Sequence, residues 1–158
     1  MGLNVFQSLR KGVSGQQPLP HVPAFKDLYE AGVTPRQGQV VMVAGRSGSQ
    51  KSGFALYWVA SMGLPTLYFS ADMAPFTAGV RLASIATGMS SKEVEAMMGT
   101  TNGRAQIEQA ASSLPIELSF GSPITWEQVE DELNAYVMLH NMFPKVVVFD
   151  NLMDFAGC

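Results

Sequence analysis

The side chains best suited to chemistry gather in one short stretch, Gly45-Arg46-Ser47-Gly48-Ser49-Gln50-Lys51-Ser52. Its two glycines allow the backbone to curl so that several amide N–H groups converge, which is the arrangement that phosphate oxygens require. Lys51 adds a cation for the outer phosphates, and the Ser52 hydroxyl is an oxygen ligand of the kind that Mg²⁺ prefers. The stretch therefore predicts a loop that binds nucleotide phosphates together with magnesium.

The stretch is similar to the P-loop, a motif in which a buried strand leads into a phosphate-binding loop and a helix leaves it. It departs from the motif at Gln50, where the motif normally has Gly, and a Cβ there presses on the loop or on the nucleotide. An ordinary Gly- and Ser-rich turn between a strand and a helix is the alternative interpretation. The lysine, the hydroxyl and the flanking apolar segments favour phosphate binding.

Two aspartates follow apolar segments further along the chain. Asp150 comes directly after the apolar residues 146–149, and Asp72 comes shortly after Thr66–Ser70. Because α/β sheets bind ligands at the carboxyl ends of their strands, we expect Asp150 to hold Mg²⁺ through water. Asp72 is expected to orient the water that attacks a γ-phosphate. Each aspartate also has a structural alternative, Asp150 as the start of a turn and Asp72 as a helix N-cap.

The apolar pattern predicts the strands and helices that have to position these residues. Continuous β-branched runs at residues 39–44 and 145–149 predict buried strands, the first of which leads into the loop. Shorter strands are expected at Thr66–Ser70 and Ile116–Phe120. Helices are expected at residues 22–32, 51–62, 75–87, 90–98 and 102–113, and a last one after Thr125. Two of them are expected to begin with a capping box, formed by Ser90 with Glu93 and by Thr125 with Gln128. This alternation predicts an α/β fold with a mostly parallel sheet flanked by helices.

Length and composition limit the classes of protein to consider. The chain has 158 residues with 47% hydrophobic and 15% charged side chains, which is typical of one globular domain. Ten Lys and Arg against thirteen Asp and Glu give a net charge of -3, so the domain as a whole lacks the excess of positive charge that is typical of nucleic-acid-binding proteins. The single cysteine, Cys158, excludes an intramolecular disulfide. No apolar run approaches the roughly 20 residues that span a bilayer, and we expect a soluble, cytoplasmic protein without membrane contact.

Three stretches together resemble the ATPase core of RecA-like hexameric motors, and most closely the DnaB-type replicative DNA helicases. They are residues 44–56 around the loop, Phe69-Ser70-Ala71-Asp72-Met73 with Arg81-Leu82, and Val148-Phe149-Asp150-Asn151-Leu152. The resemblance implies that residues 24–158 are the N-terminal portion of a RecA-like ATPase domain. Residues 1–23, rich in Gly, Ser, Gln and Pro, are typical of an arm or linker.

The resemblance also implies a function. It indicates an ATP- and Mg²⁺-dependent motor that acts in DNA replication as a homo-oligomeric ring on single-stranded DNA, similar to the phage members of the family. In such a motor Lys51 neutralises the β and γ oxygens, Ser52 and Asp150 hold the metal, and Asp72 places the attacking water. The family usually has Glu where this chain has Asp72, and Tyr, Leu and Gln where it has Asn151, Leu152 and Met153. These departures concern turnover more than nucleotide binding.

The same resemblance implies a core that is incomplete after the strand ending at Asp150, the Walker B strand. RecA-like cores place a later sensor strand between the loop strand and this strand, and then add DNA-binding loops and an arginine that acts in the neighbouring subunit. We therefore expect a fragment, a truncated product, or one half that a complementing C-terminal fragment completes, with the DNA contacts in that half. ATP hydrolysis by this chain alone is expected to be poor, because the arginine contributes several orders of magnitude in rate.

Two other functions are compatible with the same residues. One is a small-molecule P-loop kinase in which Asp72 binds the acceptor hydroxyl. The other is a non-catalytic nucleotide-binding module, which Gln50 favours.

The remaining polar and aromatic candidates have simpler interpretations. His21 and His140 are too few for a metal site, and His140 is expected to be hydrogen-bonded in the core. Core positions are also expected for the two tryptophans, Trp58 and Trp126. Arg46 and Arg81 are expected either to reach phosphate or a neighbouring subunit, or to lie on the solvated surface.

Overall fold

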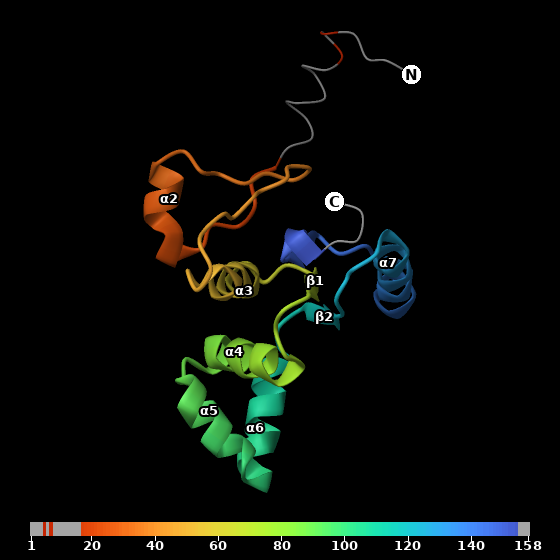
Figure 1. The fold of residues 1–158 in the computed structure, drawn as a ribbon. Helices are drawn as coiled ribbons and strands as arrows, with labels where there is room; N and C mark the ends of the chain where they lie inside the picture. Colours follow the sequence, from red (N-terminus) through yellow and green to blue (C-terminus); the bar gives the residue numbers. More distant parts are fainter. Residues whose placement is uncertain (1–4, 6, 8–16, 155–158) are drawn as a thin grey trace. The chain divides into compact units, whose positions relative to one another are not determined.

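A computed structural model describes residues 5, 7 and 17–154, in two compact units (Figure 1). The first unit ends at Gly45 and the second begins at Arg46. The predicted arm at residues 1–23 lies largely outside the described residues, and Cys158 lies wholly outside them. Apart from Gly45, all the residues predicted to do chemistry belong to the second unit.

The first unit contains a short helical segment at residues 23–30, besides the helical residues 5 and 7. The helix predicted within residues 22–32 forms as a 3-10 turn, η1 (Pro23–Phe25), followed by α2 (Lys26–Glu30). The Tyr29 hydroxyl accepts a hydrogen bond from the Val22 N–H at 3.0 Å, and the Tyr29 ring stacks on His21 with centroids 4.0 Å apart. His21 is therefore engaged in an aromatic contact within its own unit.

Three parallel strands form the sheet of the second unit: β1 (Thr66–Ser70), β2 (Ile116–Phe120) and β3 (Val146–Asp150). Their order is β2-β1-β3, so β1 is the middle strand, and every one of its residues is buried. Pairing is in register from the first residue to the last, which sets Ser70 beside Asp150. The carboxyl ends of the three strands therefore meet at one edge of the sheet.

Helices α3 (Lys51–Met62) and α4 (Pro75–Thr87) have the bounds that the sequence predicted. Each is followed by a glycine in the left-handed conformation, Gly63 with φ 62° and Gly88 with φ 73°. Glycine adopts this conformation without the steric penalty of a Cβ, which is why it ends helices so often.

The other helices of the second unit begin at side-chain caps. They are α5 (Ser91–Met98), α6 (Thr101–Ala111) and α7 (Trp126–His140). The capping box predicted at Ser90 is confirmed, because the Glu93 N–H donates to Ser90 Oγ while the Ser90 N–H donates to the Glu93 carboxylate. At α7, Thr125 Oγ1 accepts from the Gln128 N–H, which is the Thr125 half of the second predicted box.

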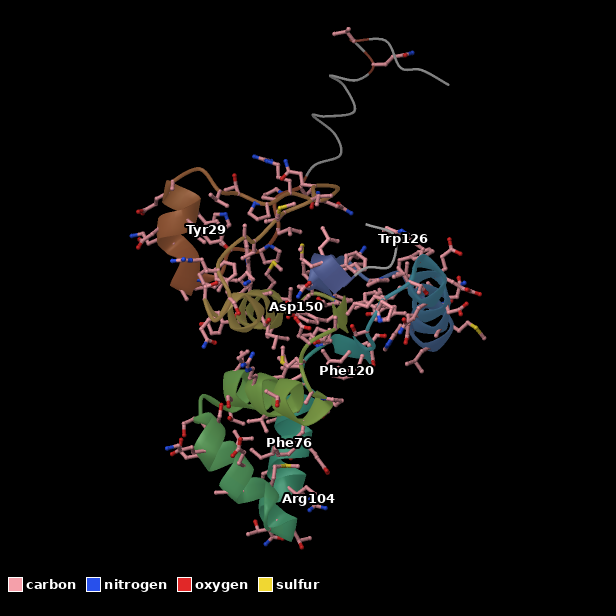
Figure 2. All side chains as sticks on the ribbon, in the orientation of Figure 1. Tyr29, Phe76, Arg104, Phe120, Trp126 and Asp150 are labelled. Atoms are coloured by element: carbon pink, nitrogen blue, oxygen red, sulfur yellow. The ribbon has the colours of Figure 1, made fainter. Side chains whose placement is uncertain are left out.

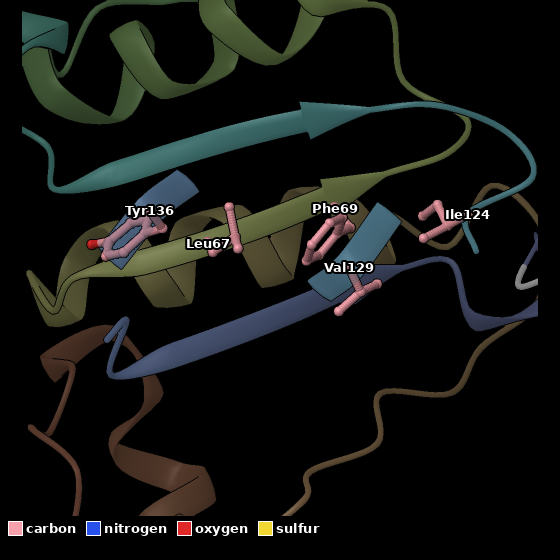
Figure 3. Close-up of a cluster of buried hydrophobic side chains, with 5 residues drawn as sticks. All are labelled: Leu67, Phe69, Ile124, Val129 and Tyr136. Atoms are coloured by element: carbon pink, nitrogen blue, oxygen red, sulfur yellow. The ribbon is translucent and has the colours of Figure 1, made fainter. Parts of the chain in front are cut away.

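Successive side chains of β1 point into two different cores. Leu67 and Phe69 point to the face covered by α7, where they pack with Ile124, Val129 and Tyr136 (Figure 3). Tyr68 points to the opposite face, where α3 and α4 surround it with Leu56, Val59, Ala60 and Leu82. A third cluster joins α4 to α5 and α6 and contains Val80, Ala83, Val94 and Ile107. The second unit is thus layered, with α7 on one face of the sheet and α3 and α4 on the other.

The strand predicted at residues 39–44 does not form. These residues have no strand or helix assignment, and Val40 exposes 96% of its surface. A strand needs a neighbour to pair its backbone N–H and C=O groups. The described residues hold no strand other than β1, β2 and β3, and none of these three pairs with residues 39–44. The prediction that this segment is the first core strand is wrong for this chain.

Two side chains predicted in the core lie at the surface. Trp126 is 59% exposed because it is the first residue of α7, where its ring meets the edge of Phe149. His140 is the last residue of α7 and is exposed, with its Nε2 3.2 Å from Glu117 Oε1. Helix periodicity assigned both residues to the apolar face, but at the ends of a helix solvent reaches that face as well. Trp58 is buried, as predicted.

The all-parallel sheet with helices on both faces confirms the prediction of an α/β fold. None of the helices in the described part of the chain is long and apolar enough to cross a membrane.

A matched pair of valine truncations tests the correction at residues 39–44. Val59→Ala, at a side chain 5% exposed in α3, is expected to lower the free energy of unfolding by roughly 2 kcal/mol, because it removes buried methyl groups and leaves a cavity. Val40→Ala is expected to change it by less than about 0.5 kcal/mol. Urea denaturation followed by circular dichroism measures both, and equal losses would show that residue 40 is packed in a core.

Candidate functional site

The direction of α3 brings the predicted loop to the carboxyl edge of the sheet. α3 packs on Tyr68 of β1, and only residues 63–65 separate the helix from the strand, so the two run antiparallel. A helix of 12 residues is about 18 Å long, close to the roughly 17 Å of a five-residue strand. The start of α3 is therefore level with the end of β3, where Asp150 lies (Figure 2), and with the end of β1, which Asp72 follows by two residues.

The loop before α3 is held in an unusual backbone conformation. Gln50 has φ 62° and ψ 27°, the left-handed region that glycine favours, and Gly48 has φ 76°. Two hydrogen bonds close the loop on the Arg46 carbonyl, one from the Ser49 N–H at 3.2 Å and one from Lys51 Nζ at 3.0 Å. The P-loop motif normally has Gly at this position, and the left-handed conformation of Gln50 explains why: a residue with a Cβ pays about 1–2 kcal/mol to adopt it.

The start of α3 has the polarity of an anion site. The first N–H groups of any helix lack intrahelical acceptors, and the helix dipole adds partial positive charge there. No side chain caps this terminus, and the first turn contains no acidic residue. Lys51 and Ser52 are the first two residues of the helix and both are half-buried. Gly45 belongs to the first unit, so the loop that can be described spans residues 46–52.

Asp150 is held by a tyrosine that the sequence analysis did not select. The Tyr68 hydroxyl donates to Asp150 Oδ2 at 2.8 Å across the β1–β3 pair. Burial raises the pKa of Tyr68 far above its usual value of about 10, and the charge and hydrogen bond of Asp150 add to the effect. The Arg81 guanidinium nearby lowers it to a lesser degree. Tyr68 is therefore a neutral donor at any physiological pH.

Asp72 is held by the residue that follows Asp150. Asn151 Nδ2 donates to Asp72 Oδ2 at 2.7 Å, and the Met153 N–H donates to Asn151 Oδ1 at 2.8 Å. The backbone hydrogen bonds between β1 and β3 also continue past the last paired residues, Ser70 and Asp150, because the Ala71 N–H donates to the Asp150 carbonyl at 2.8 Å. The two predicted carboxylates thus belong to adjacent, hydrogen-bonded chain segments, and Asp72 remains exposed.

Ser70 has a buried hydroxyl without a partner among the described residues. The residue is 1% exposed and stands beside Asp150 in the register of β1 and β3. Residues in register on neighbouring parallel strands project from the same face, so both side chains face α3. Buried polar groups in native structures are nearly always hydrogen-bonded, so the Ser70 hydroxyl is an exception in this cluster.

A shallow hollow of about 220 Å³ lies beside the loop. Arg81 of α4 lines it together with Gln50 and Gly53 of the loop and α3, and with Ser84 and Ser91. Arg81 also donates to Met73 Sδ at 3.8 Å, which draws its side chain toward the end of β1. The structure therefore brings Arg81 into the neighbourhood of the loop and of Tyr68, whereas Arg46 is exposed.

The donor set fits magnesium. Ser52 and Asp150 supply a hydroxyl and a carboxylate, which are hard oxygen ligands. Mg²⁺ keeps several waters and needs only one or two protein ligands besides phosphate. No group of three or more His, Cys, Asp and Glu side chains within the described ranges could hold a metal by itself. The site thus suits a hydrated ion that arrives with a nucleotide.

Sequence reasoning missed Tyr68, Ser70 and Asn151 as members of this cluster. A signal for Tyr68 and Ser70 was present, because they are polar residues two positions apart on a strand that is otherwise apolar. Period two puts both on the same face of the strand, and Asp150 follows the neighbouring strand. No comparable signal identified Asn151, whose contact with Asp72 depends on the pairing of β1 with β3.

A pair of loop variants tests the left-handed conformation at the start of α3. Gln50→Gly is expected to raise the free energy of unfolding by up to about 1 kcal/mol, since it removes the Cβ penalty. Gly48→Ala is expected to lower it by about 1 kcal/mol, because it introduces the same penalty. Urea denaturation measures both, and a destabilising Gln50→Gly would contradict the strained conformation.

The buried phenol predicts a pH dependence of stability. The folded chain keeps the Tyr68 proton, whereas the unfolded chain loses it above about pH 10, so stability is expected to fall as pH rises above about 10. The slope from this group is at most about 1.4 kcal/mol per pH unit, and Tyr68→Phe is expected to remove it. Denaturation between pH 9 and 11, with the more exposed Tyr57 changed to Phe as control, measures the difference; an unchanged slope in Tyr68→Phe would refute the assignment.

Comparison with known proteins finds two mycobacteriophage relatives. The chain is 33% identical over 148 residues to the Gene 65 protein of Mycobacterium phage L5, a match that covers 94% of this chain and 54% of the relative. It is 31% identical over 115 residues to the Gene 65 protein of Mycobacterium phage D29, covering 73% of this chain and 50% of that relative. No family model and no solved structure matches. The chain thus spans about half the length of the curated relatives it matches.

Proposed function

We propose that this chain binds ATP with Mg²⁺ as the nucleotide-binding part of a RecA-like, DnaB-type hexameric motor that acts on DNA. The observation that carries the proposal is the arrangement at the carboxyl edge of the sheet. There the uncapped start of α3, with Lys51 and Ser52, is level with the strand ends that bear Asp72 and Asp150. Phosphate, magnesium and an attacking water require these group types at the end of a parallel sheet.

Each residue has a role in the proposed site. The amide groups that open α3 and the Lys51 ammonium hold the phosphate oxygens, for which Lys51 has to exchange its bond with the Arg46 carbonyl. Ser52 and Asp150 hold the magnesium ion, which neutralises charge on the β- and γ-phosphates when it is bound. Asp72 accepts a hydrogen bond from the water aligned with the γ-phosphate. Ring assembly and DNA binding are proposed for the motor as a whole and are assigned to no residue of this chain.

A non-catalytic nucleotide-binding module is a second candidate, and one contact favours it. Asn151 already donates to Asp72, so this carboxylate has to exchange its partner before it can orient a water. Phosphate release assayed with ATP, Mg²⁺ and single-stranded DNA separates the two functions. Turnover supports the motor, and nucleotide binding without turnover in the assembled ring supports the module.

A lysine pair tests the proposed nucleotide site. Lys51→Ala is expected to weaken ATP binding at least about 100-fold, because it removes the ammonium that the proposal places on the outer phosphates. Lys145→Ala is the matched control, since this exposed lysine precedes β3 at the opposite edge of the sheet, and its effect is expected to stay below about twofold. Isothermal titration calorimetry with ATP and MgCl₂ measures both affinities.

The same titration of the unmodified chain decides the proposal. Absence of binding heat at millimolar ATP, in a sample whose circular dichroism shows the folded state, would overturn it. Equal losses in Lys51→Ala and Lys145→Ala would show that binding is non-specific.

A further inference from the structure

The side chain of Gln50 lies against the first turn of α3. Its Oε1 is 3.4 Å from the position that a Cβ on Gly53 would take, so the lack of a side chain at Gly53 leaves room for the carboxamide. Both residues line the shallow hollow of about 220 Å³ beside the loop. The Gln50 side chain is exposed, and its carboxamide has no hydrogen-bond partner within residues 17–154. The loop therefore presents one donor group and one acceptor at the edge of the hollow.

The hollow begins at the loop and continues along α3. Gln50 and Gly53 lie at its loop end, and Tyr57 lines it one helical turn further on, roughly 6 Å along the axis from Gly53. Side chains of α4 form the opposite wall, among them Ser84 and Ile85. A nucleotide whose phosphates meet the amide groups that open α3 carries its base on a short ribose link, so the base has to lie on a surface that adjoins the loop. The hollow is a concave surface of this kind.

The size and lining of the hollow suit one flat base. Pockets that enclose a whole drug-sized ligand measure roughly 300–1,000 Å³, and this hollow is smaller. Leu56 and Ile85 line it with apolar side chains, and Tyr57, which is 38% exposed, adds an aromatic ring. Aromatic side chains stack on every base, because each base has a π-face. These three residues therefore provide affinity for a base without selecting which one.

Gln50 is the side chain of the hollow that can distinguish one purine from the other. A carboxamide pairs in a bidentate manner with adenine, which offers the N6 amino group as donor and N7 as acceptor on one edge. Guanine offers two acceptors on that edge, O6 and N7, so Oε1 would face another acceptor. Two acceptors would suit Arg81, but its Nη1 donates to Met73 Sδ at 3.8 Å, toward the end of β1. The hollow therefore favours adenine.

We infer that the hollow is the base subsite of the bound nucleotide and that the Gln50 carboxamide selects adenine by pairing with N6 and N7. The inference rests on the proposed function and extends it, because it assigns recognition of the base to named side chains. It gives a binding role to the residue at which the loop departs from the P-loop motif. Gln50 acts on the base in this arrangement, while the phosphates remain with Lys51 and the amide groups that open α3.

Calorimetry in MgCl₂ with three nucleotides measures the selection. The unmodified chain is expected to bind ATP about tenfold more tightly than GTP, since a bidentate pair is lost. It is expected to bind 7-deaza-ATP, which lacks N7, several-fold more weakly than ATP, since one hydrogen bond is lost. Gln50→Met keeps the Cβ and the length of the side chain but removes the amide, and its three affinities are expected to agree within about twofold.

Two further measurements separate the base from the phosphates and control for the substitution. Inorganic tripolyphosphate has no base, so Gln50→Met is expected to bind it within about twofold of the unmodified chain. Gln109→Met is the matched control, because this exposed glutamine lies on α6 and does not line the hollow, and it is expected to keep the preference for ATP. Tyr57→Ala is expected to weaken ATP and GTP alike by about tenfold, since it removes the ring on which either base stacks.

Each other outcome overturns a defined claim. Equal affinities for ATP, 7-deaza-ATP and GTP in the unmodified chain would exclude recognition of N6 and N7, and a preference for ATP that persists in Gln50→Met would exclude Gln50 as its source. Equal losses of ATP and tripolyphosphate binding in Gln50→Met would show that Gln50 acts on the phosphates. In all three cases the nucleotide site itself would stand. If the unmodified chain bound neither ATP nor tripolyphosphate, the proposed function would fail, and this inference with it.

Discussion

The pairing of β1 with β3 is the constraint on which the candidate site depends. It joins segments far apart in the chain, Thr66–Ser70 and Val146–Asp150, in register and in parallel, and it makes β1 the buried middle strand. A shift of one residue would turn Asp150 to the face covered by α7 and away from α3. It would also break the bond between Tyr68 and Asp150 and the one between Asp72 and Asn151. The apolar contacts of β1 on both faces hold this register.

Local signals in the sequence were sufficient to predict the helices that flank the site. Pro75 and Gly88 delimit α4, Gly63 ends α3, and Ser90 with Glu93 starts α5, and each of these signals acts within a few residues. The strands β1, β2 and β3 were also predicted almost to the residue, since each is a short apolar run between turn residues. For the site, the sequence indicated Lys51, Ser52, Asp72 and Asp150 from their places at the ends of these elements. Their proximity then follows from the parallel topology.

What the sequence could not provide are the contacts that depend on which strands pair. Tyr68 and Asp150 are 82 positions apart, and Asn151 and Asp72 are 79 apart, so no local pattern connects them. Residues 39–44 show the opposite failure. Their β-branched run is a strand signal of the same kind as that of β3, but a strand is stable only beside a partner. The composition of a segment indicates its ability to pair, while the rest of the chain determines whether it does.

Gln50 shows how a side chain can be at odds with its backbone and still be retained. Its φ of 62° is constrained on its N-terminal side by the loop, which closes on the Arg46 carbonyl, and on its C-terminal side by the helix, which starts at Lys51. The Phe54 N–H donates to the Gln50 carbonyl at 2.9 Å, which fixes the residue as the N-cap of α3. A turn with no other requirement would be more stable with Gly here. Strain of this kind is retained where the surrounding structure overdetermines it, and it concentrates at ligand-binding loops. The conformation of Gln50 is therefore set by the contacts on either side of it and not by the preference of its own side chain.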